Sequence, residues 1–181
     1  MLTVLLGGAR SGKSALAVEI ASRARNGVTD GVTYLATSPT IPGDDDLAER
    51  IARHRAERPS TWTTVEEQLD IAAALARVDT PVVIVDCLTL WAGNMLHHGH
   101  DESAILDASD AAIAAITDRD LVSIVISNEV GLGIVPVNEL ARGYRDVLGR
   151  VNHRWVAAAD RALFMVAGLA LPLHEPHGLL R

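Results

Sequence analysis

Residues 7–14 have the types and spacing needed to bind the phosphates of a nucleotide. Their sequence, GGARSGKS, matches the pattern G-x-x-x-x-G-K-S/T. In such a loop the glycines let the backbone bend around the phosphates, the lysine reaches the β- and γ-phosphate oxygens, and the hydroxyl coordinates Mg²⁺. Gly7, Gly12, Lys13 and Ser14 hold these positions. The pattern predicts that the chain binds a nucleoside triphosphate; a simple glycine turn is the alternative interpretation.

Asp86 is a candidate second contributor to the metal site. It ends the β-branched run of residues 82–85, and phosphate-loop enzymes hold their Mg²⁺ with a carboxylate at the end of such a strand. Taken alone, an aspartate in this place is also typical of a turn or a helix cap. Together with the loop, it predicts a Mg²⁺ site made by Ser14 and Asp86.

His54 lies in a basic segment and has two interpretations. On a helix over residues 45–58, Leu47, Ile51 and His54 share one face, which is typical of a charged surface helix with a histidine beside its apolar stripe. A neutral imidazole is also a nucleophile toward phosphorus, and arginines can neutralise the charge of departing pyrophosphate. Spacing alone favours the structural interpretation. The neighbouring arginines are Arg50, Arg53, Arg55 and Arg58.

Two other patterns have weaker functional readings. His97, His98 and His100 look like a metal-binding tract, but no acidic or thiol residues follow at ligand spacing, so we expect an exposed loop. Residues 127–136 carry glycines suited to a close approach of the backbone. They do not form a dinucleotide-binding fingerprint, because the third glycine and the following helix are missing.

The elements that must position these residues alternate between strands and helices. Such alternation predicts an α/β domain with a mostly parallel sheet covered by helices on both faces. Ligands then bind at the carboxyl edge of the strands, where the loop lies. The predicted strands cover residues 2–6, 32–36, 82–86, 121–127 and 162–167, with an antiparallel edge at 169–173. The predicted helices cover 15–25, 45–58, 66–78, 103–116 and 138–160, and the last buries Leu140, Tyr144, Val147, Val151 and Trp155.

Length and composition limit the classes of protein that remain. With 181 residues, 49% of them hydrophobic, the chain can bury one core, so a single domain over 1–181 with a loosely held tail at 175–181 is expected. A lone Cys87 excludes an internal disulfide and suits the cytoplasm. A net charge of -7 and 3% aromatic residues argue against nucleic-acid binding. No leader or membrane-length apolar run is seen.

Blocks throughout the chain resemble one family, the bifunctional adenosylcobinamide kinase / adenosylcobinamide-phosphate guanylyltransferases of cobalamin biosynthesis. The most specific blocks are N-E-V-G-x-G-I-V-P at 128–136 and R-I-x-x-H-x-x-x-R-P at 50–59. Further similarity lies at 7–14, 34–38, 86–94 and 140–152. The resemblance implies a three-layer P-loop NTPase domain similar to the recombinase core (RecA-like), assembled as a homotrimer.

The resemblance also implies two reactions on one corrinoid substrate. The γ-phosphoryl group of ATP or GTP passes to the aminopropanol hydroxyl of adenosylcobinamide. GMP then passes from GTP, through a histidine-bound GMP, onto that phosphate to give adenosylcobinamide-GDP and pyrophosphate. The family's guanylylated histidine falls on His54, and Lys13 is the second catalytic residue. The implied nucleotide contacts are Gly7, Gly8, Ala9, Arg10, Ser11, Gly12, Lys13, Ser14, Ala36, Thr37, Ser38, Arg55, Ala56, Glu57, Arg58, Glu66 and Asp86.

Two other functions match part of the pattern. A kinase for a small metabolite would use the same loop and Asp86 with a structural His54, and it would form no GMP adduct. A GTP-dependent switch usually reads guanine with N-K-x-D, which is absent from this sequence. The D-x-x-G match of such a switch, at residues 146–149, falls inside a predicted helix.

Overall fold

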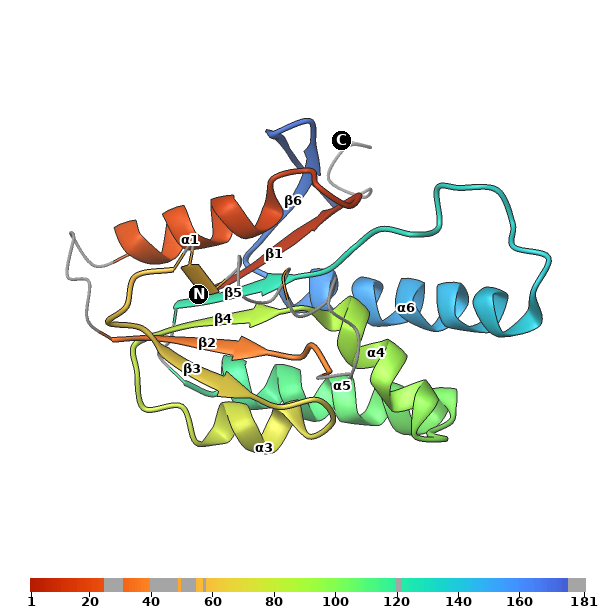
Figure 1. The fold of residues 1–181 in the computed structure, drawn as a ribbon, viewed down its shortest axis with the longest axis horizontal. Coiled ribbons are helices and arrows are strands. Elements are labelled where there is room, and N and C mark those ends of the chain that lie inside the picture. The colour runs from red at the N-terminus through yellow and green to blue at the C-terminus, as the bar shows by residue number, and fades with distance from the viewer. Residues whose placement is uncertain (25–30, 40–48, 50–54, 57, 120–121, 176–181) are drawn as a thin grey trace.

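The computed structural model describes residues 1–24, 31–39, 49, 55–56, 58–119 and 122–175. Within them, seven strands form one sheet in the order β3-β2-β4-β5-β1-β6-β7 (Figure 1). Neighbouring strands pair in parallel, except for the antiparallel pair of β6 and β7. The strands are β1 (Leu2–Gly7), β2 (Val32–Ala36), β3 (Thr63–Glu66), β4 (Val82–Asp86), β5 (Val122–Ile126), β6 (Arg161–Val166) and β7 (Leu169–Pro172).

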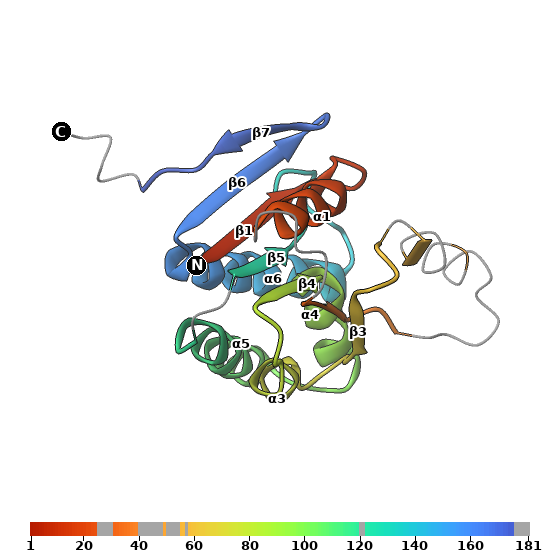
Figure 2. The same cartoon turned by 90° about the vertical axis from the view of Figure 1, so that its left-hand side faces the viewer.

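Helices cover both faces of this sheet. α1 lies on one face, and α3, α5 and α6 lie on the other (Figure 2). The bounds are α1 (Lys13–Arg23), α3 (Ile71–Ala76), α4 (Leu88–His97), α5 (Glu102–Thr117) and α6 (Glu139–Ala158). None of these described helices is long and apolar enough to cross a membrane. The arrangement confirms the predicted α/β class with a mostly parallel sheet between two helical layers.

Side chains alternate between the two faces of the central strands, so the strands contribute to two cores. Val83 and Val85 of β4 belong to the larger core beneath α3, α4, α5 and α6. Val82 and Ile84 belong to the smaller core beneath α1. Because successive residues of a strand point to opposite faces, Asp86 continues the Val82 and Ile84 series on the α1 face. The strand pattern thus directs this carboxylate toward the helix that follows the phosphate loop.

Side chains cap the first turns of α3, α5 and α6, whereas α1 and α4 begin without a side-chain cap. The side chain of Asp101 accepts a hydrogen bond from the backbone N–H of Ala104 at 2.9 Å, and Asn138 caps α6 in the same way at 3.2 Å. Such caps satisfy N–H groups that have no partner within the helix. In α6, Val147, Val151 and Trp155 are buried as predicted, but Leu140 is 79% exposed. The first turns of α6 extend past the ends of the strands, so Leu140 has no core to enter (Figure 1).

The structure corrects two further expectations. The helix predicted from Glu66 begins only at Ile71, because residues 63–66 form the edge strand β3. α4 was not predicted; it is buried at Leu88, Thr89, Trp91, Ala92 and Met95, so its sequence lacks a clear polar face. Of the helix predicted over 45–58, the described residues 49, 55 and 56 are helical. Arg58 is also described and lies in a bend rather than in the helix, while the other positions lie outside the described residues, as do 176–181 of the predicted tail.

A buried polar network ties the end of β5 to α4 and α6. The Ser127 hydroxyl donates to Oδ1 of Asn152 at 2.6 Å, and Nδ2 of Asn152 donates to the carbonyl of Asn128 at 3.0 Å. The backbone N–H of Asn128 donates to Oγ1 of Thr89 at 2.7 Å. Buried polar groups are costly when unpaired, so this network fixes the chain as it leaves the sheet.

We predict that Asn152→Ala destabilises the protein by about 1–3 kcal/mol, because the Ser127 hydroxyl and the Asn128 carbonyl lose a buried partner. Urea unfolding followed by circular dichroism measures this change. The control is His153→Ala, an exposed neighbour on the same helix, which should stay within about 0.5 kcal/mol of the parent. Equal stabilities of the two variants would contradict the role given to the network.

Candidate active site

The phosphate loop connects the end of β1 to the start of α1. Gly7 has φ 145°, Gly12 has φ 98° and Arg10 has φ 58°, so the loop uses backbone conformations that glycine adopts most easily. A Cβ atom on Gly7 would lie 2.4 Å from the carbonyl oxygen of Met165 in β6. The packing of β1 against β6 therefore requires glycine at the first position of the motif.

Lys13 lies inside this loop. Its Nζ donates to the carbonyl oxygens of Gly7 at 2.9 Å and Gly8 at 2.7 Å. Burial lowers the pKa of Lys13 from its usual value, while the nearby charge of Asp86 acts in the opposite direction. The loop thus holds a cation among residues whose backbone N–H groups bind a phosphate in proteins with this motif.

Asp86 faces the loop from β4. The hydroxyl of Ser14 donates to Oδ2 of Asp86 at 3.4 Å, and the phenol of Tyr34 donates to the same oxygen. Carboxylate and hydroxyl oxygens are the ligands that Mg²⁺ prefers. The structure therefore brings Ser14 and Asp86 together, as the sequence predicted, with oxygen donors suited to a hard cation. Tyr34 was not predicted as part of this cluster.

The end of β2 is fastened to the start of α4. Oγ1 of Thr37 donates to the carbonyl of Cys87 and accepts from the backbone N–H of Cys87, both at 2.8 Å. Nδ2 of Asn94 donates to the carbonyl of Thr37 at 2.8 Å. Ala36 pairs with Asp86 in the sheet, and Ser38 follows Thr37 at the same edge. These predicted nucleotide contacts thus lie at the carboxyl edge with the loop.

The basic segment approaches this edge through two arginines. Arg55 forms an ion pair with Glu66 at the end of β3. The guanidinium carbon of Arg58 lies 3.2 Å from the ring centroid of Tyr34. Ala56 is exposed between them. Two of the predicted site residues, His54 and Glu57, lie outside the described residues.

Ser11 and Gly12 of the phosphate loop lie against the turn between β6 and β7, a contact that the sequence did not predict. Gly12 lies beside the turn between β6 and β7, where Gly168 donates its backbone N–H to the carbonyl of Ser11 at 3.0 Å. Arg10, like Gly8 and Ala9, is exposed on the loop. The β6–β7 turn therefore braces the loop from the side opposite Asp86's strand β4, and only the sheet order reveals this support.

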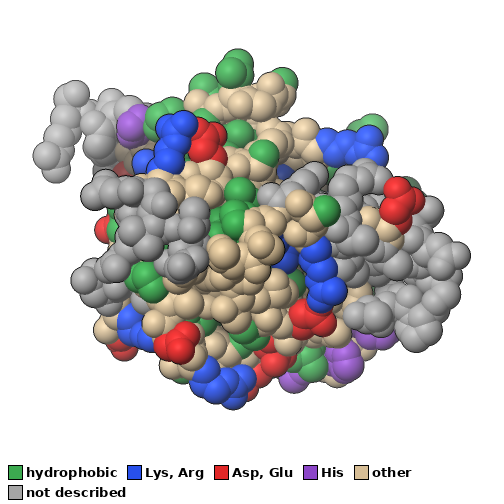
Figure 3. Space-filling model, turned by 60° about the vertical axis from the view of Figure 1, so that its left-hand side comes forward, with side chains coloured by type: hydrophobic (Ala, Val, Ile, Leu, Met, Phe, Trp, Pro, Cys, Tyr) green, Lys and Arg blue, Asp and Glu red, His purple; other side chains and the backbone are tan. Residues whose placement is uncertain are grey.

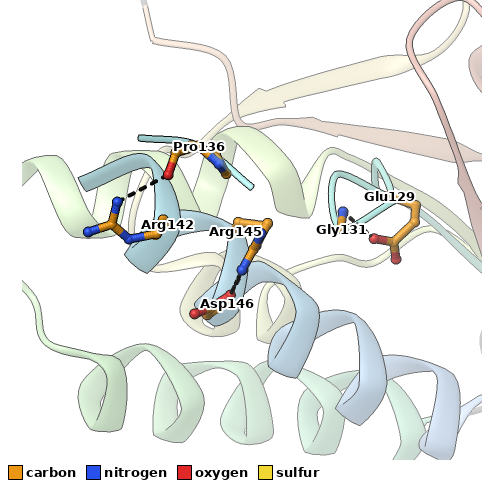
Figure 4. A network of polar contacts seen from close by, with 6 residues as sticks. All are labelled: Glu129, Gly131, Pro136, Arg142, Arg145 and Asp146. Atoms are coloured by element: carbon orange, nitrogen blue, oxygen red, sulfur yellow. Dashed lines mark hydrogen bonds and ion pairs between the residues drawn. The ribbon is translucent and has the colours of Figure 1, made fainter. Parts of the chain in front are cut away.

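A cleft of about 670 Å³ lies beside α6, away from any residue of the predicted site. Its arginines already have acidic partners: Arg145 pairs with Asp146 at 3.0 Å, and Arg150 and Arg154 pair with side chains of α5. Figure 4 shows the adjoining loop, where Glu129 accepts from the N–H of Gly131 and Arg142 donates to the carbonyl of Pro136. The cleft is lined by Leu106, Gly131, Arg145, Asp146, Gly149, Arg150, His153 and Arg154.

The histidine tract is exposed, as predicted, although His97 is the last residue of α4 rather than part of a loop. The rings of His97 and His98 lie edge to face with centroids 5.6 Å apart. Among the described residues, no group of three or more histidine, cysteine, aspartate or glutamate side chains is arranged to hold a metal ion. The tract therefore gives no support to its alternative interpretation as a metal site.

The fold is similar to a solved structure of distant sequence. It superposes with a TM-score of 0.56 on the crystal structure of the flagellar accessory protein FlaH from Methanocaldococcus jannaschii. The two share 16% sequence identity, and the match covers 95% of this chain and 77% of that chain. At this identity the likeness concerns the fold alone.

Sequence comparison gives closer relatives. The chain is 42% identical over 177 residues to the bifunctional adenosylcobalamin biosynthesis protein CobP of Pseudomonas aeruginosa, covering 96% of this chain and 97% of that protein. It is 38% identical to the bifunctional adenosylcobalamin biosynthesis protein CobU of Salmonella typhimurium and 36% identical to that of Escherichia coli. Each of these matches covers 96% of this chain and 99% of the relative.

A family model agrees with these relatives. The model described as cobinamide kinase / cobinamide phosphate guanyltransferase matches residues 3–173, which include the phosphate loop, Asp86 and all of the described sheet except Leu2. With a phosphate loop, a facing carboxylate and relatives that match it over nearly their whole length, the chain belongs to the cobinamide kinase / cobinamide phosphate guanyltransferase family.

Proposed function

We propose that the chain carries out two transfers at the carboxyl edge of its sheet. In the first, ATP or GTP phosphorylates the aminopropanol hydroxyl of adenosylcobinamide. In the second, GMP from GTP passes through a histidine-bound intermediate to that phosphate, yielding adenosylcobinamide-GDP and pyrophosphate. The observation that carries the proposal is the meeting of Lys13, Ser14 and Asp86. Arg58 lies over the ring of Tyr34, whose hydroxyl donates to Asp86.

In the proposed site, the loop anchors the triphosphate for both reactions. Backbone N–H groups at the start of α1 and the ammonium of Lys13 offset the charge that develops on the transferring phosphorus. Phosphoryl transfer depends mainly on such positioning and electrostatic stabilisation. A single phosphate loop can therefore serve both the γ- and the α-phosphorus if the nucleophile differs.

The proposed metal ligands are Ser14 and Asp86. Their oxygens lie 3.4 Å apart at the edge of the α1 face, and both oxygen types suit Mg²⁺. When bound, Mg²⁺ would supply charge neutralisation for the phosphates. Asp86 and Ser14 hold its place from two different elements, β4 and α1.

His54 is the proposed nucleophile of the second reaction. Its nitrogen attacks the α-phosphorus of GTP, a P–N bond forms and the P–O bond to pyrophosphate breaks. An oxygen of the corrinoid phosphate then attacks the same phosphorus, which breaks the P–N bond and returns the imidazole. Support comes from Arg55 and Arg58, which follow His54 in sequence and contact Glu66 at the end of β3 and Tyr34 of β2.

The remaining nucleotide contacts are proposed from the family resemblance and from their place beside the loop. They are Gly7, Gly8, Ala9, Arg10, Ser11, Gly12, Ala36, Thr37, Ser38, Ala56, Glu57 and Glu66. A cytoplasmic location is proposed because both reactions consume nucleoside triphosphates. We keep the single domain over 1–181 as part of the same proposal.

A homotrimer is the proposed assembly. Apolar side chains stand exposed on the segment before α6, where Ile134 and Val137 are both 98% exposed. More lie on β7, whose Leu169 is 74% exposed. Figure 3 shows apolar side chains gathered at the top of the molecule, where Figure 1 places the β6–β7 hairpin. Contact between copies would remove such groups from water.

We predict that Lys13→Ala lowers both reactions by about 100- to 1,000-fold, because either transfer needs the charge of the triphosphate offset next to the reacting phosphorus. Kinase turnover and guanylyl transfer are measured in separate assays. Parent-like rates in one assay would show that the two reactions do not share the loop.

For the metal site, we predict that Asp86→Asn raises the Mg²⁺ concentration needed for half-maximal turnover by about tenfold or more. The amide keeps the size of the side chain but removes the charge that attracts the cation. Turnover is titrated with Mg²⁺ at saturating nucleotide. The same half-saturation in mutant and parent would remove Asp86 from the metal site.

His54→Asn separates the two reactions and tests the proposed function. The variant should still make adenosylcobinamide phosphate from ATP, since that step uses the substrate hydroxyl as its nucleophile at the γ-phosphorus. It should take up no label from GTP labelled at the α-phosphate and release no pyrophosphate. In the parent, the label should be lost in acid and kept in base, as for a P–N bond.

Two results would count against His54. Labelling of His54→Asn at the parent's level would place the nucleophile elsewhere, and His97, His98 and His100 would be tested next. A parent that phosphorylates its substrate but never carries label would instead favour a kinase with a structural histidine.

A further inference from the structure

Tyr34 is buried between the two halves of the proposed site. It lies on β2 with 2% of its surface exposed and packs in the core beneath α1 with Leu5, Ile84 and Trp62. In the sheet it pairs with Thr64 of β3 on one side and Ile84 of β4 on the other. Its ring and its hydroxyl each contact a proposed site residue.

The hydroxyl of Tyr34 contacts the proposed metal ligand. It donates a hydrogen bond to Oδ2 of Asp86, the oxygen that also faces Ser14. A phenol is protonated at neutral pH, because its ordinary pKa is about 10, and a carboxylate can only accept, so the Tyr34 hydroxyl is the donor of this bond. Groups that hydrogen-bond to a ligating carboxylate fix its orientation and tune its affinity for metal.

The ring face of Tyr34 contacts the basic segment. The guanidinium carbon of Arg58 lies 3.2 Å from the ring centroid, a cation–π arrangement. Nε and Nη1 of Arg58 are buried and have no hydrogen-bond partner among the described residues. The next residues anchor this placement, because the N–H of Trp62 donates to the carbonyl of Pro59 and Trp62 is buried beside Tyr34.

A guanidinium with unmatched donors is suited to an anion, and Arg58 is connected to the phosphate loop through Tyr34, Asp86 and Ser14. The Tyr34 ring holds the guanidinium group of Arg58 in position, but it does not replace the hydrogen bonds that Nε and Nη1 lack. Tyr34 thereby connects Arg58 to the Asp86 carboxylate, although the three residues come from β2, β4 and the segment before β3.

We propose that Tyr34 is a positioning residue for both reactions: its hydroxyl orients Asp86 toward the metal, and its ring holds Arg58 for the phosphates of GTP. This inference rests on the proposed function, because it assumes that Asp86 serves the metal and Arg58 the nucleotide. Its two contacts predict two separable effects. Loss of the hydroxyl acts through the metal in both reactions, whereas loss of the ring acts in addition on guanylyl transfer.

The first test compares Tyr34→Phe with Tyr144→Phe. The chain has two tyrosines, and Tyr144 also donates its phenol to a partly buried acceptor, the carbonyl of Thr89 at 3.1 Å. Both variants lose one such hydrogen bond and keep the ring. We expect Tyr34→Phe to raise the half-saturating Mg²⁺ concentration about tenfold in both reactions. Tyr144→Phe should leave the half-saturating Mg²⁺ concentration within about twofold of the parent's value. Its urea midpoint should shift by about as much as that of Tyr34→Phe, because each variant loses one hydrogen bond.

A binding measurement gives a readout independent of turnover. Mn²⁺ is titrated, with its free concentration followed by electron paramagnetic resonance, in the presence of a GTP analogue with a methylene group between the α- and β-phosphorus. Tyr34→Phe should weaken Mn²⁺ binding about tenfold. Unchanged Mg²⁺ half-saturation and unchanged Mn²⁺ binding, with only reduced stability, would reduce Tyr34 to a structural core residue.

The second test addresses the ring. Tyr34→Leu removes both contacts, and Arg58→Lys keeps the charge but loses the planar group that stacks on the ring. Both should lower labelling of the protein by α-labelled GTP about fivefold at saturating Mg²⁺, while Arg58→Lys keeps the parent's Mg²⁺ half-saturation. If Arg58→Lys is labelled at the parent's rate, the ring contact has no function. Since Arg58→Lys leaves the core intact, this outcome is available even if Tyr34→Leu fails to fold.

These experiments separate this inference from the proposed function. A parent that makes no corrinoid phosphate and carries no label contradicts the proposed function, whatever the variants do. A parent that is active in both assays, with Tyr34→Phe indistinguishable from it in Mg²⁺ dependence and Mn²⁺ binding, contradicts only the role of Tyr34.

Discussion

The site is organised around the partly buried carboxylate of Asp86. A charge removed from water must be compensated by hydrogen bonds and by opposite charge. Here Ser14 and Tyr34 donate to one of its oxygens, and the charge of Lys13 lies close enough to interact with it. The compensating groups come from the loop, from α1 and from β2. The environment of the carboxylate therefore depends on the packing of α1 and β2 against β4.

The strand ends around the site are held in place by hydrogen bonds from buried polar side chains, and not by apolar packing alone. Thr37 fixes the end of β2 to Cys87, directly after Asp86. The Ser127–Asn152 pair does the same for the end of β5. Strand ends expose backbone groups that would otherwise need water, so these side chains both satisfy the backbone and hold the neighbouring site residues in register.

Local sequence was sufficient where one segment carries its own physical signal. The loop at 7–14, the buried strand ending in Asp86 and the capped helix α6 all lie close to their predicted places. The predictions were wrong where the structure of a segment depends on residues that are distant in the sequence. Residues 63–66 are mostly exposed and polar and form a strand only because they pair with β2, and Leu140 is exposed because its turn of α6 lies beyond the sheet. The contact of Arg58 with Tyr34 joins residues of different elements, so no periodicity could indicate it.

The site geometry also bears on how one loop can serve two chemistries. Phosphoryl transfer to a hydroxyl and guanylyl transfer to a histidine need the same charge compensation but different phosphorus atoms and nucleophiles. The elements that would be common to both reactions, Lys13, Ser14 and Asp86, belong to the central strands and α1. Arg55 and Arg58 instead reach the site from outside the sheet, through Glu66 and Tyr34. The residues proposed for the second reaction alone therefore lie on different elements from those that both reactions would share, and Tyr34 is the link between the two groups.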